Sequence, residues 1–222
     1  MSVLVYRDRP TACAAAATLL SAGIIEKPNI VLGLDCAQEL LPVYRTLGRM
    51  TADGLLEWSG VKVFQMYEHV RADADHSVEG RLGSVLLDKV AVAEENRYLP
   101  RMNGNDWSVV CNDYESEILN AGGIDTVFCA IRADGSIAYN LGGAELAPVT
   151  HVERTEEGRV VTVGIATIMA AKRIIAVMTG SDKVNAAVAT FSGPIVPGVP
   201  ASYLQLHRNA VFILDEDAAE RI

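Results

Sequence analysis

The chain has 222 residues and a mass of 23.8 kDa; half of its residues are apolar, and its formal net charge is −9. This size and composition predict one compact α/β domain spanning residues 1–222 and exclude a disordered or fibrous protein. The acidic balance argues against nucleic-acid and anionic-lipid surfaces, because phosphate groups bind clustered Lys and Arg. We therefore expect no nucleic-acid partner, no membrane partner and a cytoplasmic location, since the first residues do not resemble a signal peptide.

The predicted strands are short, continuous apolar runs, which indicates burial on both faces, as in a mostly parallel sheet. Strands are expected at 2–6, 29–34, 61–66, 125–131, 159–163, 174–178 and 210–214. Helices are expected between them, most clearly at 10–20, 77–92 and 108–121. This alternation predicts a doubly wound, mostly parallel sheet with helices on both faces.

The cysteines are too widely spaced for a metal knuckle or a dense disulfide framework. They are Cys13, Cys36, Cys111 and Cys129. We expect reduced, mostly buried thiols, with no metal and no cofactor.

Ligands of doubly wound sheets bind at the carboxyl ends of the strands, so the residues that follow each strand are the site candidates. In chain order they are Asp35, Gln38, Glu39, Tyr67, Glu68, His69, Asp134, Ser136, Asn140 and Lys183. Some of these have plainer explanations. The segment from Gly180 to Lys183 fits an ordinary turn in which Ser181 or Asp182 caps the next helix, or an anion site beside Lys183.

Several ordered stretches carry a family resemblance. They are 31–34 with 42–44, 122–125 with 133–140, 162–169, 179–183, and 200–207 with 209–215. Together they resemble the glucosamine-6-phosphate deaminase (isomerase) family from the N-terminus to about Ala219. The resemblance implies a modified doubly wound α/β fold, a sugar-phosphate substrate and self-association.

The resemblance also implies a catalytic relay that this chain has largely replaced. Tyr67 stands at the position of the family's general-base aspartate, Ser136 at that of the ring-opening histidine, and Leu141 at that of the supporting glutamate. A phenol with an ordinary pKa near ~10 is a poor base at neutral pH, and a serine hydroxyl does not titrate there. With these replacements included, the side chains that this chain offers for catalysis are Tyr67, Glu68, His69, Asp134 and Ser136.

The resemblance places the sugar phosphate at the loop 36–40, where this chain has Glu39. Two like charges ~4 Å apart repel each other by about 4 kcal/mol at an effective dielectric near 20. Lys183 alone matches a phosphate contact. The acidic loop counts against the family's phosphorylated substrate, and sugar-like substrates with and without a phosphate both stay open. The substrate-binding candidates are Asp35, Gln38, Glu39, Asn140 and Lys183.

Three functions remain open at this point. The first is a divergent enzyme that isomerises, deaminates or hydrolyses a sugar-like compound. The second is a catalytically silent relative that binds a sugar-like effector or a protein partner. The third is a conventional glucosamine-6-phosphate deaminase. We favour the first, because most of the replaced site positions keep polar side chains.

Overall fold

The computed structural model describes residues 1–70, 77–100, 106–156 and 158–222. Within these ranges seven strands form a parallel sheet in the order β1–β10–β9–β6–β2–β3–β5. These strands are β1 (Ser2–Tyr6), β2 (Val31–Leu34), β3 (Lys62–Gln65), β5 (Arg97–Tyr98), β6 (Thr126–Ala130), β9 (Arg173–Met178) and β10 (Ala210–Asp215). All residues of β2 and β6 are buried, as their continuous apolar runs predicted. The parallel α/β fold is confirmed.

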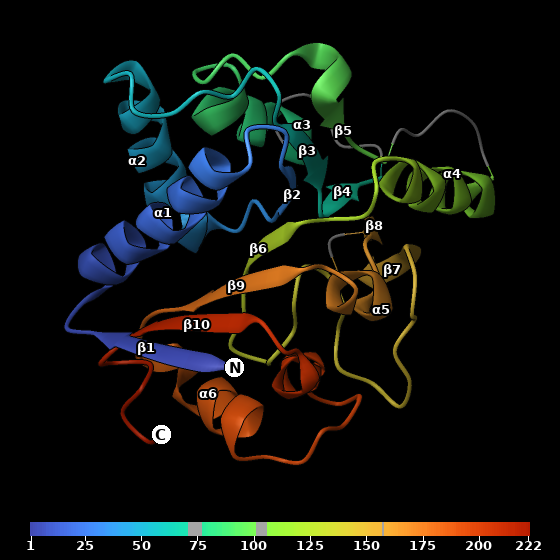
Figure 1. Cartoon of the computed structure of the whole chain (residues 1–222). Helices are drawn as coiled ribbons and strands as arrows, with labels where there is room; N and C mark the ends of the chain where they lie inside the picture. Colours follow the sequence, from blue (N-terminus) through green and yellow to red (C-terminus); the bar gives the residue numbers. More distant parts are fainter. Residues whose placement is uncertain (71–76, 101–105, 157) are drawn as a thin grey trace.

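Helices cover both faces of this sheet (Figure 1). On one face lie α1 (Arg9–Glu26) and α2 (Leu41–Ala52), and on the other lie α6 (Val184–Phe191) and the 3₁₀-helix η5 (Pro200–Leu206). The remaining helices are α3 (Val78–Leu82), α4 (Trp107–Asn120) and α5 (Ile165–Met169). Asp8 caps the start of helix α1: its carboxylate accepts the Thr11 N–H at 2.9 Å, and Pro10 lies in the first turn. Pro fits there because the first N–H groups of a helix lack intrahelical partners.

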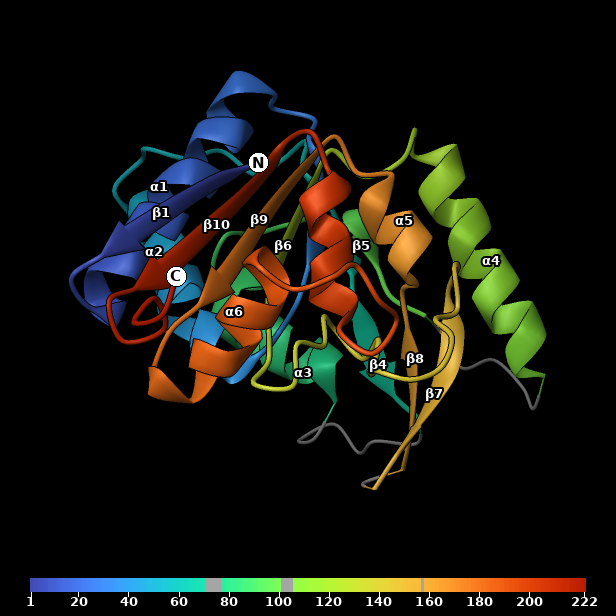
Figure 2. The same cartoon turned by 90° about the horizontal axis from the view of Figure 1, so that it is seen from below.

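A second, antiparallel sheet lies beside α4 in the order β4–β8–β7 (Figure 2). Its strands are β4 (Tyr67–His69), β7 (His151–Thr155) and β8 (Gly158–Thr162). The expectation that 159–163 joins the parallel sheet is therefore wrong. This segment instead pairs as a hairpin with β7, whose polar sequence and partial burial gave no continuous apolar signal.

The helix expected over 77–92 is shorter than predicted. Helix α3 ends at Leu82 and continues as a π-helical turn, η2 (Gly83–Leu87). The Gly83 carbonyl accepts from the Asp88 N–H at 3.1 Å, five residues on. Glycine is a weak helix former, so Gly80 and Gly83 explain why the apolar periodicity does not continue as an α-helix.

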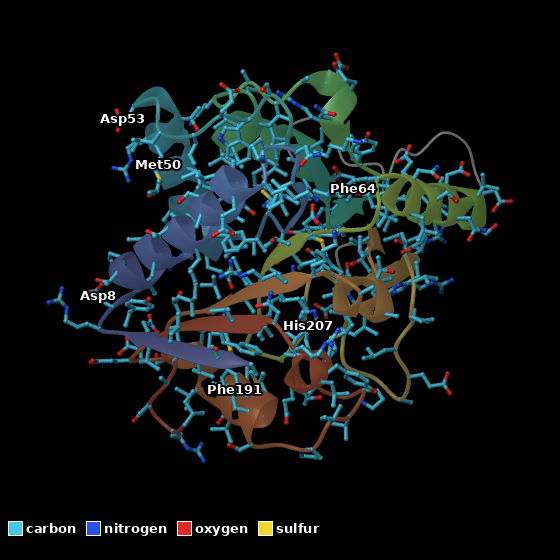
Figure 3. The ribbon with its side chains drawn as sticks, in the orientation of Figure 1. Asp8, Met50, Asp53, Phe64, Phe191 and His207 are labelled. Atoms are coloured by element: carbon cyan, nitrogen blue, oxygen red, sulfur yellow. The ribbon has the colours of Figure 1, made fainter. Side chains whose placement is uncertain are left out.

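Aromatic side chains fill the core at both ends of the sheet (Figure 3). Phe64 on β3 stacks on Tyr98 of β5, with ring centroids 4.3 Å apart. Phe191 at the end of α6 meets Phe212 of β10 edge-on at 4.8 Å. The first contact joins two neighbouring strands, and the second packs α6 against the sheet.

Asp125 ties the amino ends of β2 and β6 together. Its carboxylate contacts Lys27 at 2.6 Å and Lys172 at 2.8 Å, and accepts the Val31 N–H at 2.8 Å. Burial alone would raise the pKa of Asp125, but the hydrogen bonds from Lys172, Lys27 and Val31 outweigh it and lower that pKa.

The change Asp125→Asn is expected to destabilise the fold by about 1 kcal/mol at pH 7, since both lysines are partly exposed. The lowered folded-state pKa means that Asp125 stabilises the protein above its unfolded pKa near ~3.9, and that this contribution is lost as pH falls through the folded pKa. Urea unfolding at pH 7 and at successively lower pH should show the difference between wild type and variant shrinking as the pH falls. A constant difference would contradict the linkage.

Candidate functional site

The candidate residues gather where β2, β3, β6 and β9 reach the same edge of the sheet with their carboxyl ends. Two contacts join the loops there. The Asp35 carboxylate after β2 accepts the Ala130 N–H of β6 at 3.1 Å. The Lys183 ammonium after β9 lies 3.7 Å from the Glu39 carboxylate. These contacts bring the segments after β2 and β9 and the end of β6 into one region, as the strand-end rule predicts.

Asp35 is a buried carboxylate that shapes this region. One oxygen accepts the Ala37 N–H at 2.8 Å and the other accepts that of Ala130. The Tyr44 hydroxyl donates to the Asp35 carbonyl from α2. Burial raises the pKa of Asp35, and the positive charge of Arg132 opposes that rise. Asp35 thus stabilises the loop after β2 and interacts electrostatically with the Arg132 guanidinium.

Arg132 stacks on two tyrosines at the centre of the site. Its guanidinium lies 4.2 Å from the Tyr139 ring centroid and 5.8 Å from that of Tyr67. The two tyrosine rings meet edge-on with centroids 4.6 Å apart. Burial raises the pKa of Tyr67 well above its usual range. Tyr67 is therefore a neutral phenol and not a base at neutral pH.

His69 completes this aromatic cluster from β4. Its ring lies 5.4 Å from that of Tyr139, and its Nε2 is 3.5 Å from the Tyr139 hydroxyl. Side chains alternate along a strand, so Tyr67 and His69 share one face of β4 while Glu68 takes the other. The cluster therefore holds one imidazole, a side chain that can both accept and donate a proton.

The loop after β6 takes an unusual backbone path that positions Tyr139. Ala138 has φ +52°, a conformation that non-glycine residues adopt at a cost. Gly135 has φ +79°, and a Cβ there would lie 2.8 Å from Val199. Asn140 is buried, and its amide donates to the Val163 carbonyl at 2.8 Å. A strained, tightly held loop of this kind is typical of a functional site.

Lys183, which the family resemblance matches to a phosphate contact, lies between two carboxylates of this chain. It contacts Asp182 at 2.8 Å and Glu39 at 3.7 Å. The turn is held by Gly180, which has φ +97° and whose N–H donates to the Asp215 carboxylate at 2.9 Å. The expected helix cap by Ser181 or Asp182 is wrong, because α6 starts without a side-chain cap bond from the described residues.

Glu68 is separate from this cluster and organises the start of α3. Its carboxylate accepts the N–H groups of His69 at 2.8 Å, Val78 at 2.9 Å and Glu79 at 2.9 Å. It also accepts the Gln65 side-chain amide at 2.9 Å. These four donors satisfy both oxygens, so the contacts favour a structural role over the expected catalytic one.

The change Glu68→Ala is expected to lower the free energy of unfolding by about 3–5 kcal/mol, because several buried donors lose their acceptor at once. Glu79→Ala, at an exposed neighbouring position, should stay within about 0.5 kcal/mol of the wild type. Urea unfolding measures both. A Glu68→Gln protein that keeps wild-type stability but loses turnover would instead support the catalytic assignment.

Of the seven buried side-chain polar atoms without a hydrogen-bond partner among the described residues, all but those of Arg173 and Thr190 lie in this region. Among the described residues these include the Arg132 Nη1, the Ser136 Oγ, the Asn140 Oδ1 and the Thr179 Oγ1. The Glu39 Oε1 also lacks a hydrogen bond, since its ion pair with Lys183 is too long to be one. Most buried polar atoms in proteins are satisfied, so such a concentration at strand ends indicates a ligand site.

The remaining candidates lie at the border of the site. Asp134 and Gln38 are exposed, and Asp134 accepts the Ser136 N–H at 2.9 Å as an ordinary turn does. Sequence reasoning did not select Arg132 and Tyr139. Arg132 directly follows the strand predicted at 125–131, and that position alone could have marked it as a site candidate.

Over the described ranges, no group of three His, Cys, Asp or Glu side chains is placed to hold a metal ion. All four cysteines are buried, and burial raises the pKa of the Cys36 thiol to about 12. In the same part of the chain, no helix is both long and apolar enough to span a bilayer.

Comparisons with known proteins identify the family. The family model described as glucosamine-6-phosphate isomerases/6-phosphogluconolactonase matches residues 11–213. A glucosamine-6-phosphate deaminase of Clostridioides difficile (strain 630) is 31% identical over 241 residues, covering 100% of this chain and 97% of that protein.

Solved structures agree with this family. A monomeric glucosamine-6-phosphate deaminase has a TM-score of 0.94 at 25% identity, with 99% of each chain covered. The 6-phosphogluconolactonase of Trypanosoma brucei has the same fold, with a TM-score of 0.83 at 19% identity, covering 100% of this chain and 98% of that one. The family resemblance is confirmed: the chain belongs to the family of glucosamine-6-phosphate isomerases and 6-phosphogluconolactonases.

Proposed function

We propose that the chain is a divergent enzyme of this family that acts on a sugar-like compound through a carbonyl or carboxylate group bound by Arg132. The observation that carries this proposal is the Arg132 guanidinium, stacked 4.2 Å from the Tyr139 ring centroid. Its buried Nη1 has no hydrogen-bond partner among the described residues. Leaving a buried charged donor unsatisfied is costly, so a ligand oxygen is the partner that the site requires.

Arg132 and His69 together offer the two functions that isomerisation of a sugar and hydrolysis of a lactone both need. One is a donor for the carbonyl oxygen as it gains negative charge, and the other is a group that accepts and returns a proton. In the hydrolytic case, water adds to the lactone carbonyl and His69 accepts its proton. That proton then passes to the ring oxygen as the carbon–oxygen bond breaks.

The substrate is proposed to lack the phosphate of the family's usual substrates. Glu39 and Asp182 already contact the Lys183 ammonium, so Lys183 offers a phosphate no uncompensated positive charge. A phosphate would have to displace Glu39 or overcome its repulsion. A substrate with a neutral hydroxyl in place of the phosphate would neither displace Glu39 nor be repelled by it.

The second candidate is a conventional glucosamine-6-phosphate deaminase, which the names of the relatives favour. Against it stand the neutral Tyr67 and the Ser136 hydroxyl at the positions of the family's base and histidine.

Two assays on the purified protein separate the candidates. The first measures ammonia and fructose 6-phosphate formed from glucosamine 6-phosphate. The second measures hydrolysis of glucono-1,5-lactone and isomerisation of unphosphorylated aldoses, above the spontaneous rates. We expect turnover only in the second assay. Robust ammonia release would establish the conventional deaminase, and binding of gluconate without any turnover would establish a silent relative.

A further inference from the structure

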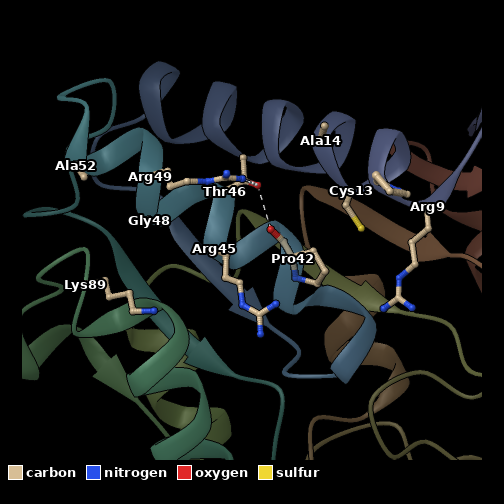
Figure 4. Close-up of a pocket in the computed structure, with 11 residues that line it drawn as sticks. Arg9, Cys13, Ala14, Pro42, Arg45, Thr46, Gly48, Arg49, Ala52 and Lys89 are labelled. Carbon is tan, nitrogen blue, oxygen red and sulfur yellow. Dashed lines mark hydrogen bonds between the residues drawn. The ribbon is translucent and has the colours of Figure 1, made fainter.

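A hollow lies between α1, α2 and the turn that carries Lys89 (Figure 4). Its volume is about 920 Å³, the size of a pocket for a complete small molecule. The first turns of α1 form one wall, and one face of α2 forms another. None of its described lining residues belongs to the candidate site.

Four cationic side chains line this hollow, which we call the cationic groove: Arg9, Arg45, Arg49 and Lys89. In Figure 4, Lys89 extends toward Arg45 from one side, and Arg9 lies on the other. Among the described residues that line the groove there is no carboxylate. Arg45 and Arg49 are one helical turn apart on α2, a spacing at which like charges repel. Such a gathering is unexpected on a chain with a net charge of −9.

Two carboxylates close to groove residues, Asp88 and Asp182, are already paired with cations. Asp88, beside Lys89 in the chain, contacts Arg97 at 2.6 Å. Lys183 lowers the pKa of Asp182, and Arg9 contributes to the same shift, so Arg9 is partly compensated. Within the described residues, the other three cations form no ion pair with a carboxylate. The positive charge without a carboxylate partner is therefore that of Arg45 and Arg49 on α2 and of Lys89.

The rest of the groove is uncharged and largely apolar. Pro10, Cys13 and Ala14 line it from α1, and Pro42 and Ala52 line it from the two ends of α2. A single phosphate or carboxylate would leave most of this volume unfilled and would reach only part of the cationic cluster. The occupant must carry several negative charges at one end and an organic body at the other.

We propose that the cationic groove binds an organic polyphosphate of the nucleoside triphosphate class. Its phosphates contact Arg45, Arg49 and Lys89, and its organic body packs against Pro10, Ala14 and Pro42. The groove is independent of Arg132 and of the reaction proposed above, so either proposal can fail without the other.

The test uses isothermal titration calorimetry of the full chain with ATP, sodium tripolyphosphate and inorganic phosphate, without divalent metal. We expect ATP to bind more tightly than tripolyphosphate, and tripolyphosphate more tightly than phosphate. Both of the tighter affinities should fall as salt rises, because salt screens exposed charges. No heat from ATP or tripolyphosphate at millimolar concentration would overturn the proposal. Equal affinity for the two would overturn the assignment of the organic body to the apolar walls.

Paired charge reversals locate the site. Arg45→Glu with Arg49→Glu should weaken ATP binding by about a hundredfold, or about tenfold for each reversed contact. The matched control reverses Arg154 and Arg159, which are exposed and opposite each other on β7 and β8, with the same change in net charge. An equal loss in both proteins, or none in the first, would overturn the assignment. The Gln variants of Arg45 and Arg49 replace the reversals if circular dichroism shows misfolding.

Discussion

The change Arg132→Leu is expected to weaken binding of D-gluconate, a sugar acid without phosphate, by about a hundredfold, because a hydrogen bond to a charged group contributes up to about 3 kcal/mol. Arg132→Lys should give an intermediate affinity, since an ammonium keeps the charge but loses the planar fork that stacks on Tyr139. Isothermal titration calorimetry measures each affinity. The control Arg159→Leu, at an exposed position on β8, should bind as the wild type does.

The same variant should change how stability depends on pH, through Asp35. Burial already raises the pKa of Asp35 in the folded state, and Arg132 limits that rise. A raised carboxyl pKa means that stability is greatest below the unfolded pKa near ~3.9 and is lost as pH rises through the folded pKa. Arg132→Leu should therefore enlarge the loss between acid and neutral pH.

Adding Asp35→Asn to Arg132→Leu should remove that extra pH dependence, because the titrating group is gone. Thermal melts from pH 4 to pH 8 would show it. If Arg132→Leu binds gluconate normally, Arg132 does not hold the ligand. If the pH dependence of its melting temperature also matches the wild type, Arg132 does not act on Asp35.

The sheet could be predicted from sequence because each central strand is a short, unbroken apolar run. β2 and β6 were found in this way, with boundaries within two residues. β7 was missed because its residues are polar and only partly buried, so nothing distinguished it from a loop. Its absence also led to the wrong placement of β8, whose partner could not be identified.

The candidate site was predicted in outline and not in its contacts. The strand-end rule selected Asp35, Glu39, Tyr67 and Lys183, and the structure joins Glu39 to Lys183 and packs Arg132 over Tyr67. The alternation of side chains along 67–69 would have separated Glu68 from its neighbours, had a strand been expected there. The stacking of Arg132 on Tyr139 depends on the left-handed backbone of Ala138, which the residue type does not predict.

The change Glu39→Gln is expected to shift the preference of the site toward a phosphorylated ligand. Glu39 lies 3.7 Å from the Lys183 ammonium, and its side chain is 21% exposed. Repulsion of a phosphate ~4 Å away is about 4 kcal/mol at an effective dielectric near 20, which corresponds to almost a thousandfold in affinity. Because Glu39 keeps some contact with solvent, we expect a gain of about a hundredfold.

The measurement is the ratio of the dissociation constants of 6-phosphogluconate and D-gluconate, since these ligands differ only in the phosphate. Glutamine keeps the size of the side chain and removes only its charge, so a change in this ratio reports electrostatics. Asp182→Asn is the matched control, because Asp182 also contacts Lys183 but its side chain is 62% exposed; a carboxylate so exposed should change the ratio only about threefold. An unchanged ratio in Glu39→Gln would mean that the phosphate end of the ligand lies elsewhere. Glu39 would then not exclude the family's phosphorylated substrates. The electrostatic argument against a conventional deaminase would fail with it.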